Sequence, residues 1–344
     1  MAHQYRFSFG PWNIHEGADP FGPDVRPSVE FGKKLAVYKK LGFEGVQFHD
    51  DDAVPDIDSK SATQVIAEAK QMKAMLDSEG LVAEIVAPRL WEDPRGIDGG
   101  YTANDPKVRQ WAIDRSKQCA DIAEALGIDL LVLWLAREGT YIRESKNALD
   151  SHQRLLEAVN AILEHHDKVR IAIEPKPNEP MDHAFIPTIG HAIALGQMSV
   201  DPSRVGGLIE TAHAILAGLD PSDEMAFALS CDKLWSVHLN DQNGLKFDQD
   251  KSFGAANLRA AFNQVRVLEK ANYPATGAFV GLDVKAMRTQ KADVAEKHLA
   301  NSKAIFEMLV EKVRSFPEAE AAECIAERDY EQLEMLVLRH LMGT

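Results

Sequence analysis

Eight short apolar segments alternate with segments of helical periodicity along this chain, and this alternation constrains its fold more than any other feature. Each segment suits one strand that is buried on both faces of a parallel sheet. The segments are residues 6–10, 45–49, 83–87, 130–134, 170–174, 205–210, 235–239 and 278–283. No change of composition marks a linker between two doubly wound domains. We therefore predict an α/β fold with one closed (β/α)8 barrel, a TIM barrel.

The segments between these strands predict helices, with a helical tail at the C-terminus. Helical spacing is clearest at residues 34–41, 62–76, 108–126, 149–165 and 255–271. We expect a catalytic barrel over residues 1–315 and a tail over residues 316–344, amphipathic to residue 342. An apolar stripe on that tail suits a surface helix or an arm that packs on a neighbouring subunit, and both readings stay open.

Charge and cysteine content exclude several classes of function. The 344 residues include 53 acidic and 38 basic residues, a net charge of −15, which argues against nucleic acid or an anionic membrane as the main partner. The three cysteines are far apart and form neither a disulfide framework nor a thiolate metal site. The N-terminus lacks a signal-peptide pattern, and no apolar run reaches the roughly 20 residues that span a bilayer, so we expect a cytoplasmic protein.

Ligand-type side chains follow the strands where the catalytic mouth of a barrel belongs. Carboxylates and imidazoles without thiolates suit Mg²⁺, Mn²⁺ or Co²⁺. So many carboxylates in one place would repel one another without cations, so we predict a site for two divalent cations. The predicted ligands are Glu174, Glu210, His213, His238, Asp248, Asp250 and Asp283.

Each of these residues has an ordinary structural explanation when taken alone. Acids after a strand commonly cap a helix, loop aspartates are common in turns, and a lone histidine is more often structural. Their joint placement favours a site, because five consecutive barrel units would otherwise place ligand-type residues at strand ends by chance.

Further residues near the strand ends suit a substrate pocket. Lys176 follows Glu174 among the carboxylates, which should keep it charged and able to polarise a substrate oxygen, although a surface lysine is the alternative. Trp12, Trp91 and Trp134 lie at or just after strand ends and either wall a water-poor slot or pack in the core. No nucleotide-binding glycine motif and no serine nucleophile motif occurs, which argues against nucleotide binding and serine hydrolysis.

At these positions the sequence resembles D-xylose isomerase, also called glucose isomerase, from about residue 7 to residue 341. The matching motifs lie at residues 19–22, 48–52, 99–105, 173–180, 187–192, 242–244 and 247–255. The resemblance implies a structural cation held by Glu174, Glu210 and Asp283, and a catalytic cation held by Glu210, His213, Asp248 and Asp250. Glu210 would bridge the two.

The resemblance also implies roles for residues around the substrate. His49, oriented by Asp52, would assist ring opening, and Lys176 would donate to the carbonyl oxygen at C1. Phe21 would reach into a neighbouring subunit's site, and the tryptophans would form its walls. Members are usually tetramers of closely packed dimers, so a homo-oligomer is expected.

Three departures from the family pattern bear on activity. His238 stands where the family has an aspartate at the structural cation, which shifts preference from Mg²⁺ toward Mn²⁺ or Co²⁺. Pro88 and Arg89 stand where the family has small polar residues, and Arg89 would bind the substrate or pair with a carboxylate. The tail is shorter than in long-armed members, which leaves dimer and tetramer open.

These observations predict an aldose–ketose isomerase that moves a hydride between C2 and C1 of an open-chain sugar lying across two cations. We expect this reaction to need no organic cofactor. The main alternative is a sugar epimerase or lyase that abstracts a proton from a keto sugar, such as a 3-keto sugar. His238 motivates it, and His49 or Lys176 would have to be the base. A third hypothesis is a non-catalytic sugar-binding barrel.

Overall fold

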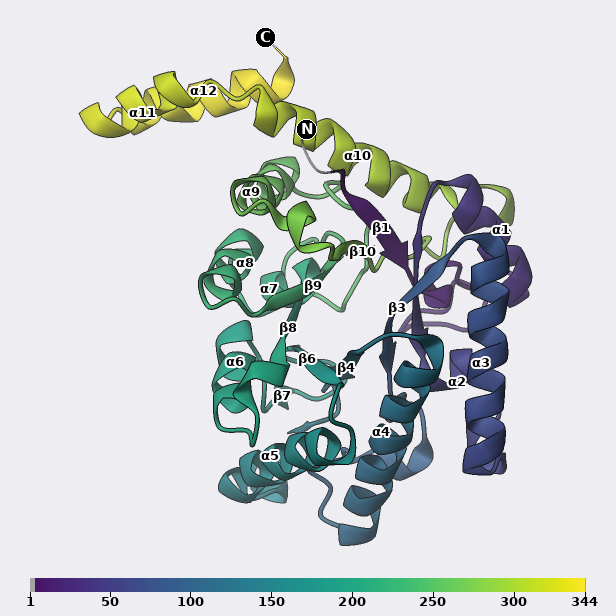
Figure 1. Cartoon of the computed structure of the whole chain (residues 1–344). Helices are drawn as coiled ribbons and strands as arrows, with labels where there is room; N and C mark the ends of the chain where they lie inside the picture. The colour runs from purple at the N-terminus through teal and green to yellow at the C-terminus, as the bar shows by residue number, and fades with distance from the viewer. Residues whose placement is uncertain (1–3, 344) are drawn as a thin grey trace.

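The structure, a computed structural model, describes residues 4–343, and within them it confirms the TIM barrel (Figure 1). Eight parallel strands close on themselves in the order β1-β10-β9-β8-β6-β4-β3-β2. Their bounds are β1 (Arg6–Phe9), β2 (Gly45–His49), β3 (Val82–Ala87), β4 (Leu130–Trp134), β6 (Arg170–Glu174), β8 (Val205–Glu210), β9 (Leu234–Leu239) and β10 (Phe279–Leu282). Each strand lies within one residue of its predicted segment.

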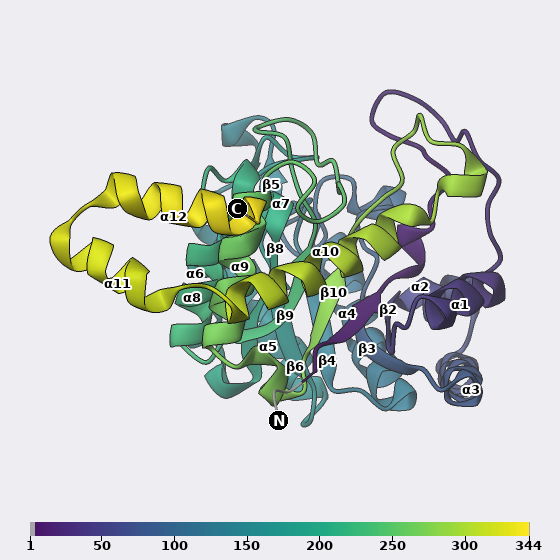
Figure 2. The same cartoon turned by 90° about the horizontal axis from the view of Figure 1, so that it is seen from above.

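Helices surround the barrel on its outer side, as Figures 1 and 2 show. They are α1 (Phe31–Lys40), α2 (Asp50–Ala53), α3 (Ala62–Glu79), α4 (Pro106–Leu126), α5 (Ala148–His165), α6 (Ile189–Gln197), α7 (Thr211–Leu216), α8 (Pro221–Ser230), α9 (Leu258–Lys270) and α10 (Lys297–Arg314). A two-stranded sheet of β5 (Gly139–Thr140) and β7 (His183–Ala184) lies outside the barrel. Helix α9 begins later than predicted because the Asn257 side chain caps it by accepting from the Ala260 backbone N–H at 3.0 Å.

The pleat of the strands decides which side chains reach the barrel mouth. Leu130 and Val132 of β4 belong to the cluster inside the barrel, whereas Leu131 and Leu133 pack in the larger core beneath the helices. Because alternate residues share a face, the last residue of β4, Trp134, points to the barrel axis like Leu130 and Val132. The same parity turns Glu174, after Ala172, and Glu210, after Leu208, inward. The strand ends thereby place their polar residues in the mouth.

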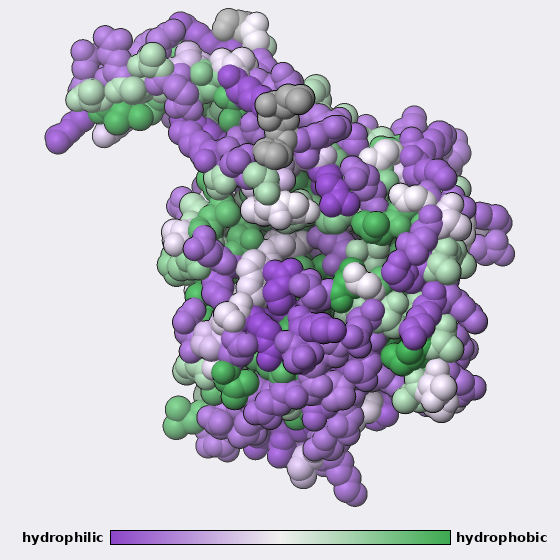
Figure 3. Space-filling view, viewed as in Figure 1, coloured by the Kyte–Doolittle hydropathy of each residue, from purple (hydrophilic) through white to green (hydrophobic). Residues whose placement is uncertain are grey.

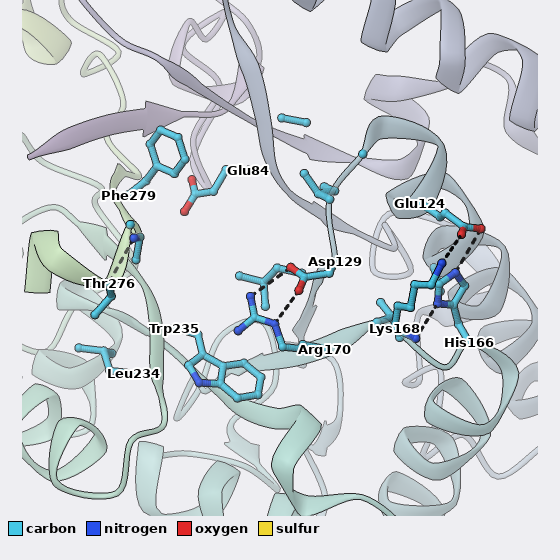
Figure 4. A pocket seen from close by; sticks show the side chains of 18 of the residues that line it. Glu84, Glu124, Asp129, His166, Lys168, Arg170, Leu234, Trp235, Thr276 and Phe279 are labelled. Atoms are coloured by element: carbon cyan, nitrogen blue, oxygen red, sulfur yellow. Dashed lines mark hydrogen bonds and ion pairs between the residues drawn. The ribbon is translucent and has the colours of Figure 1, made fainter.

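The opposite mouth, at the N-terminal ends of the strands, holds a buried polar network. Glu84 accepts hydrogen bonds from Ser8, from Gln47 Nε2 at 3.0 Å and from Ser236 Oγ at 3.0 Å, which joins four strands. Glu84, Trp235 and Phe279 also line a cavity of about 750 Å³. Figure 4 shows these three side chains. Since chemistry in such barrels belongs to the other mouth, and since Glu84 is fully hydrogen-bonded, we assign this network to stability.

The C-terminal tail forms two helices, α11 (Glu318–Glu327) and α12 (Tyr330–Met342), which lie against each other and project from the barrel (Figures 1 and 2). The break between them falls at Arg328, whose φ of 59° is left-handed, and Asp329 then caps α12. Ion pairs from Arg259 and Arg266 to the tail join it to α9. Figure 3 shows hydrophobic residues on the tail among hydrophilic ones. Five of the tail's large hydrophobic residues are exposed: Ile325, Tyr330, Met335, Leu338 and Met342.

Two further findings concern the helices and the cysteines among the described residues. None of their helices has the length and apolar character needed to cross a membrane. Cys119 and Cys324 are buried and Cys231 is exposed, all as free thiols.

His298 of α10 is a buried histidine that makes the fold sensitive to acid. Its ring contacts the Asn13 carbonyl oxygen at 2.8 Å, and burial lowers its pKa from 6.5 to about 4. Below pH 6.5 the unfolded chain binds a proton here, whereas the folded chain does so only near pH 4. The free energy of unfolding should therefore decrease by about 3 kcal/mol as the pH falls through this window.

Urea unfolding of the wild type and of His298→Gln at several pH values measures this effect. The difference in stability between the two proteins should change by about 3 kcal/mol between pH 6.5 and 4, because the variant lacks the titrating group. His183→Gln is the control, because His183 is exposed. A difference that stays constant with pH would contradict the prediction.

Candidate active site

All seven predicted ligands meet at the mouth formed by the C-terminal ends of the strands. The ligands form three groups of three residues, and in each group one ligand atom from every residue lies within 4.8 Å of the others. Glu210 belongs to every group. The groups are Glu174, Glu210 and His213; Glu210, His238 and Asp283; and Glu210, Asp248 and Asp250. The residues of the second group all belong to the set expected for the structural cation, and those of the third to the set expected for the catalytic cation. The first group takes residues from both sets.

Burial makes this concentration of carboxylates unfavourable without a cation. Burial raises the pKa of Glu210 well above its usual value, and the nearby Asp248 and Asp283 raise it further. Burial and the Asp248 carboxylate raise the pKa of Asp250 in the same way. Both shifts favour the uncharged, protonated forms of these two carboxyl groups. A bound cation would favour their charged, ligating forms instead.

Several buried polar atoms in the cluster make no hydrogen bond with the described residues. Both ring nitrogens of His238, Nδ1 of His213 and Oδ1 of Asp248 are buried without a hydrogen bond. His238 Nδ1 and Glu174 Oε1 are 3.6 Å apart, and although burial lowers the His238 pKa, the Glu174 charge raises it to about 9. Unpaired imidazole and carboxylate atoms around a shared carboxylate fit a divalent cation with oxygen and nitrogen ligands.

Lys176 lies at the edge of the cluster as a buried cation. Its Nζ is 2.8 Å from Asp248 Oδ2 and 3.5 Å from Glu179 Oε2, and it lies 5.1 Å from the centre of the Trp134 ring. Burial lowers the Lys176 pKa, but the Asp248 and Glu179 charges outweigh it and raise the pKa above the usual value. Lys176 is therefore charged, and it donates protons in hydrogen bonds but does not accept them.

Aromatic side chains form a continuous wall over the cluster. The His49 ring lies between Trp12, at 4.5 Å between ring centres, and Trp91, at 5.0 Å, and Trp91 meets Trp134 at 4.5 Å. These residues line a cavity of about 450 Å³ that also reaches Glu174, His238 and Asp283. A neighbouring cavity of about 320 Å³ reaches Lys176 and the remaining predicted ligands. The combined space suits a small polar molecule held against an apolar wall.

Arg89 lies beside His49 and is held by carboxylates. Its guanidinium contacts Asp51 at 2.8 Å, Asp52 at 3.0 Å and Glu92 at 3.2 Å. Of the two roles expected for Arg89, the structure therefore shows pairing with carboxylates, at the wall of the cavity. His49 Nδ1 lies 2.9 Å from Asp52 Oδ2, which is the predicted pairing.

Phe21 lies apart from the other predicted residues. Its side chain is 79% exposed in the loop after β1 and packs edge-on against Phe247 at 5.3 Å. It lines neither cavity of this chain. Its expected place in a neighbouring subunit's site stays a prediction.

A family model described as "Xylose isomerase-like TIM barrel" matches residues 35–305. The chain belongs to this family.

Solved structures at low sequence identity share the family fold. An IolI protein with a bound zinc atom is 15% identical, with a TM-score of 0.61 over 90% of this chain and 99% of that chain. A D-psicose 3-epimerase solved in the presence of D-fructose is 14% identical, with a TM-score of 0.63 over 89% and 99%. A 3-keto-D-glucoside 4-epimerase from E. coli is 13% identical, with a TM-score of 0.64 over 89% and 100%. At these identities the likeness shows the fold alone.

Within this xylose isomerase-like barrel, three supporting residues were not predicted from the sequence. Asn240 Nδ2 donates to Glu210 Oε1 at 2.8 Å and to Asp250 Oδ1 at 3.1 Å, which fixes both carboxylates. Lys285 pairs with Asp250, and Glu179 Oε2 accepts from the Asp248 backbone N–H at 2.9 Å. Asn240 and Lys285 follow strand ends, and that placement was the available signal.

Proposed function

We propose that this protein is a divalent-cation-dependent sugar isomerase that interconverts an aldose and a ketose by hydride transfer between C2 and C1. The observation that carries the proposal is the set of seven oxygen and nitrogen ligands around Glu210, beneath a cavity walled by aromatic residues. Bound cations would polarise the sugar oxygens and stabilise the charge that develops on them. Glu174, Glu210, His238 and Asp283 would hold one, and Glu210, His213, Asp248 and Asp250 the other.

The chain's own residues would then bind and orient the open-chain sugar. Trp12, Trp91 and Trp134 exclude water from one face of the substrate, which protects a migrating hydride from exchange. Lys176 is charged and buried, so it would donate a hydrogen bond to the carbonyl oxygen at C1. His49 would act at ring opening from between the two tryptophans.

A specific observation keeps the second candidate function open. His238 supplies an imidazole where D-xylose isomerases have an aspartate, and two of the similar structures are a D-psicose 3-epimerase and a 3-keto-D-glucoside 4-epimerase. An epimerase or lyase would abstract a proton beside the carbonyl of a keto sugar. Such a reaction needs an unprotonated base near the substrate carbon.

The fate of an isotope separates the two functions. Protein stripped with a chelator is given Mn²⁺, Co²⁺ or Mg²⁺ and incubated with C2-deuterated D-xylose or D-glucose. We expect ketose with deuterium retained at C1, because a hydride shift never releases the label to water. Mass spectrometry of the product checks this. Loss of the label would replace the isomerase proposal with proton abstraction.

Absence of turnover is also informative if the protein is shown to bind two ions. In that case 3-keto sugars and D-psicose are tested next, with epimerisation followed by NMR. Turnover of those substrates alone would establish the second candidate function. Cation binding without any turnover would favour the sugar-binding barrel.

We also propose that the protein is a cytoplasmic homo-oligomer, either a dimer or a tetramer. The exposed side chains of Phe21 and of Ile325, Tyr330, Met335, Leu338 and Met342 on α11 and α12 support an assembly, because a neighbouring subunit could cover them. We propose that the substrate bound at the site is a small sugar.

A further inference from the structure

The nitrogen atom His49 Nδ1 has two competing neighbours. Asp52 Oδ2 lies 2.9 Å away and Arg89 Nη2 lies 2.7 Å away, while Arg89 Nη2 also reaches Asp52 Oδ1 at 3.0 Å. Asp52 accepts hydrogen bonds and Arg89 only donates them. A neutral imidazole carries either a proton or a lone pair on Nδ1, so only one of the two contacts is a hydrogen bond.

The surroundings favour the contact with Arg89. Arg89 is a permanent cation, and its other donors are already held by Asp51 and Glu92, so its position is fixed. Its backbone N–H also donates to Asp50 Oδ1 at 3.0 Å, and Asp50 is fully buried against Arg115. A proton on Nδ1 would point at this fixed N–H group across 2.7 Å.

Asp52 loses little if His49 does not donate to it. Asp52 Oδ2 still accepts from the His49 backbone N–H at 3.0 Å, and Oδ1 accepts from Arg89. Both carboxylate oxygens therefore keep a donor, and the ion pair with Arg89 is retained.

We propose that Arg89 is a positioning residue that fixes His49 as the tautomer protonated on Nε2. Nδ1 then accepts from Arg89, and Nε2–H faces the cavity of about 450 Å³, where it has no partner among the described residues. Without this arginine, His49 would donate from Nδ1 to Asp52, and its Nε2 would then face the cavity without a proton. Arg89 thus changes His49 from an acceptor into a donor toward the substrate.

The consequence for chemistry rests on the proposed function. A protonated Nε2 would donate to a substrate oxygen that lacks a hydrogen, such as a ring or carbonyl oxygen, and would not abstract a proton from carbon. One of the two bases named for the epimerase or lyase, His49, is thereby removed, which favours the hydride shift.

The tautomer is measured directly by multiple-bond ¹H–¹⁵N NMR of protein labelled with ¹⁵N-histidine. The spectrum is recorded in Mg²⁺ at a pH above the ordinary histidine pKa of about 6.5, and His49→Gln assigns the signal by its loss. We expect a protonated Nε2 and an unprotonated Nδ1 in the wild type. In Arg89→Met we expect the pattern to reverse, because Asp52 is then the remaining partner of Nδ1.

Two further variants complete the experiment. Arg95→Met is the matched control, since Arg95 pairs with Asp93 and Asp58 in a nearby loop but does not reach His49. Arg89→Lys tests rescue, because a lysine ammonium also only donates. A wild-type His49 protonated on Nδ1, or a tautomer that is the same in wild type and Arg89→Met, would overturn the proposal.

Turnover is a separate readout. Arg89→Met should lower kcat about 10²-fold with a smaller change in KM, while Arg95→Met leaves both unchanged. The NMR result requires no substrate, so it stands or fails independently of the proposed isomerase activity. A reversed tautomer without any sugar turnover would support the proposal about Arg89 and count against the function.

Discussion

Glu210→Gln should abolish tight binding of divalent cations and lower turnover by about 10³-fold or more. Glu210 is the residue common to all three groups of ligand atoms, so its loss affects both proposed cation positions. An amide keeps the shape of the side chain but removes the charge that a bridging ligand supplies. Losing the stabilisation of developing charge by a cation costs several kcal/mol, and about 4 kcal/mol corresponds to 10³-fold in rate.

Calorimetric titration with Mn²⁺, together with the rate of ketose formation, measures both effects. Without cations, Glu210→Gln should be at least as stable as the wild type, because it removes a buried acid whose pKa is raised by burial and by its neighbours. Glu84→Gln is the matched control, a buried glutamate in the same barrel at the opposite mouth. Two cations bound by Glu210→Gln with unchanged affinity would refute the assigned site.

Lys176→Met should lower kcat by about 10² to 10³-fold and change KM less, the loss expected for one removed donor to a developing oxyanion. Methionine fills similar space beside Trp134 but cannot donate to the sugar. The change also leaves Asp248 and Glu179 without their shared cation.

Steady-state kinetics at saturating Mn²⁺ separates the catalytic effect from a loss of cation binding. Lys146→Met is the control, because Lys146 is also a buried lysine but donates to the Asp98 carbonyl oxygen and to Thr102, away from the ligand cluster. Sugar affinity and turnover that both survive in Lys176→Met would point to the sugar-binding barrel.

The sequence predicted the barrel and the position of its polar mouth well. Short apolar segments such as residues 130–134 and 170–174 are buried on both faces. They can therefore be predicted as strands without knowing which strands pair with them. Parallel strands bring their C-terminal ends to one mouth, so Glu174, Glu210 and His238 had to lie near one another once the barrel closed. The predicted ligand set rests on this topological fact.

The contacts between side chains from distant parts of the chain were not predictable in this way. Asn240 supports Glu210 across 30 residues, and Arg89 reaches His49 across 40 residues, and neither pairing has a spacing that a sequence pattern reveals. The C-terminal tail was also only partly predictable from the sequence. Its apolar stripe predicts a helix but not the turn at Arg328 that divides it into two.

The sequence by itself therefore determined the fold class and which kinds of side chain lie at the mouth. Burial shows itself in the short-range pattern of apolar residues, and the barrel topology brings the strand ends together. The tertiary structure decided how these groups are paired. The direction in which Arg89 points depends on Asp51, Asp52 and Glu92 together, and that direction sets the hydrogen-bonding state of His49. Pairing at distances near 3 Å depends on the exact placement of several backbones, which only the packed barrel provides.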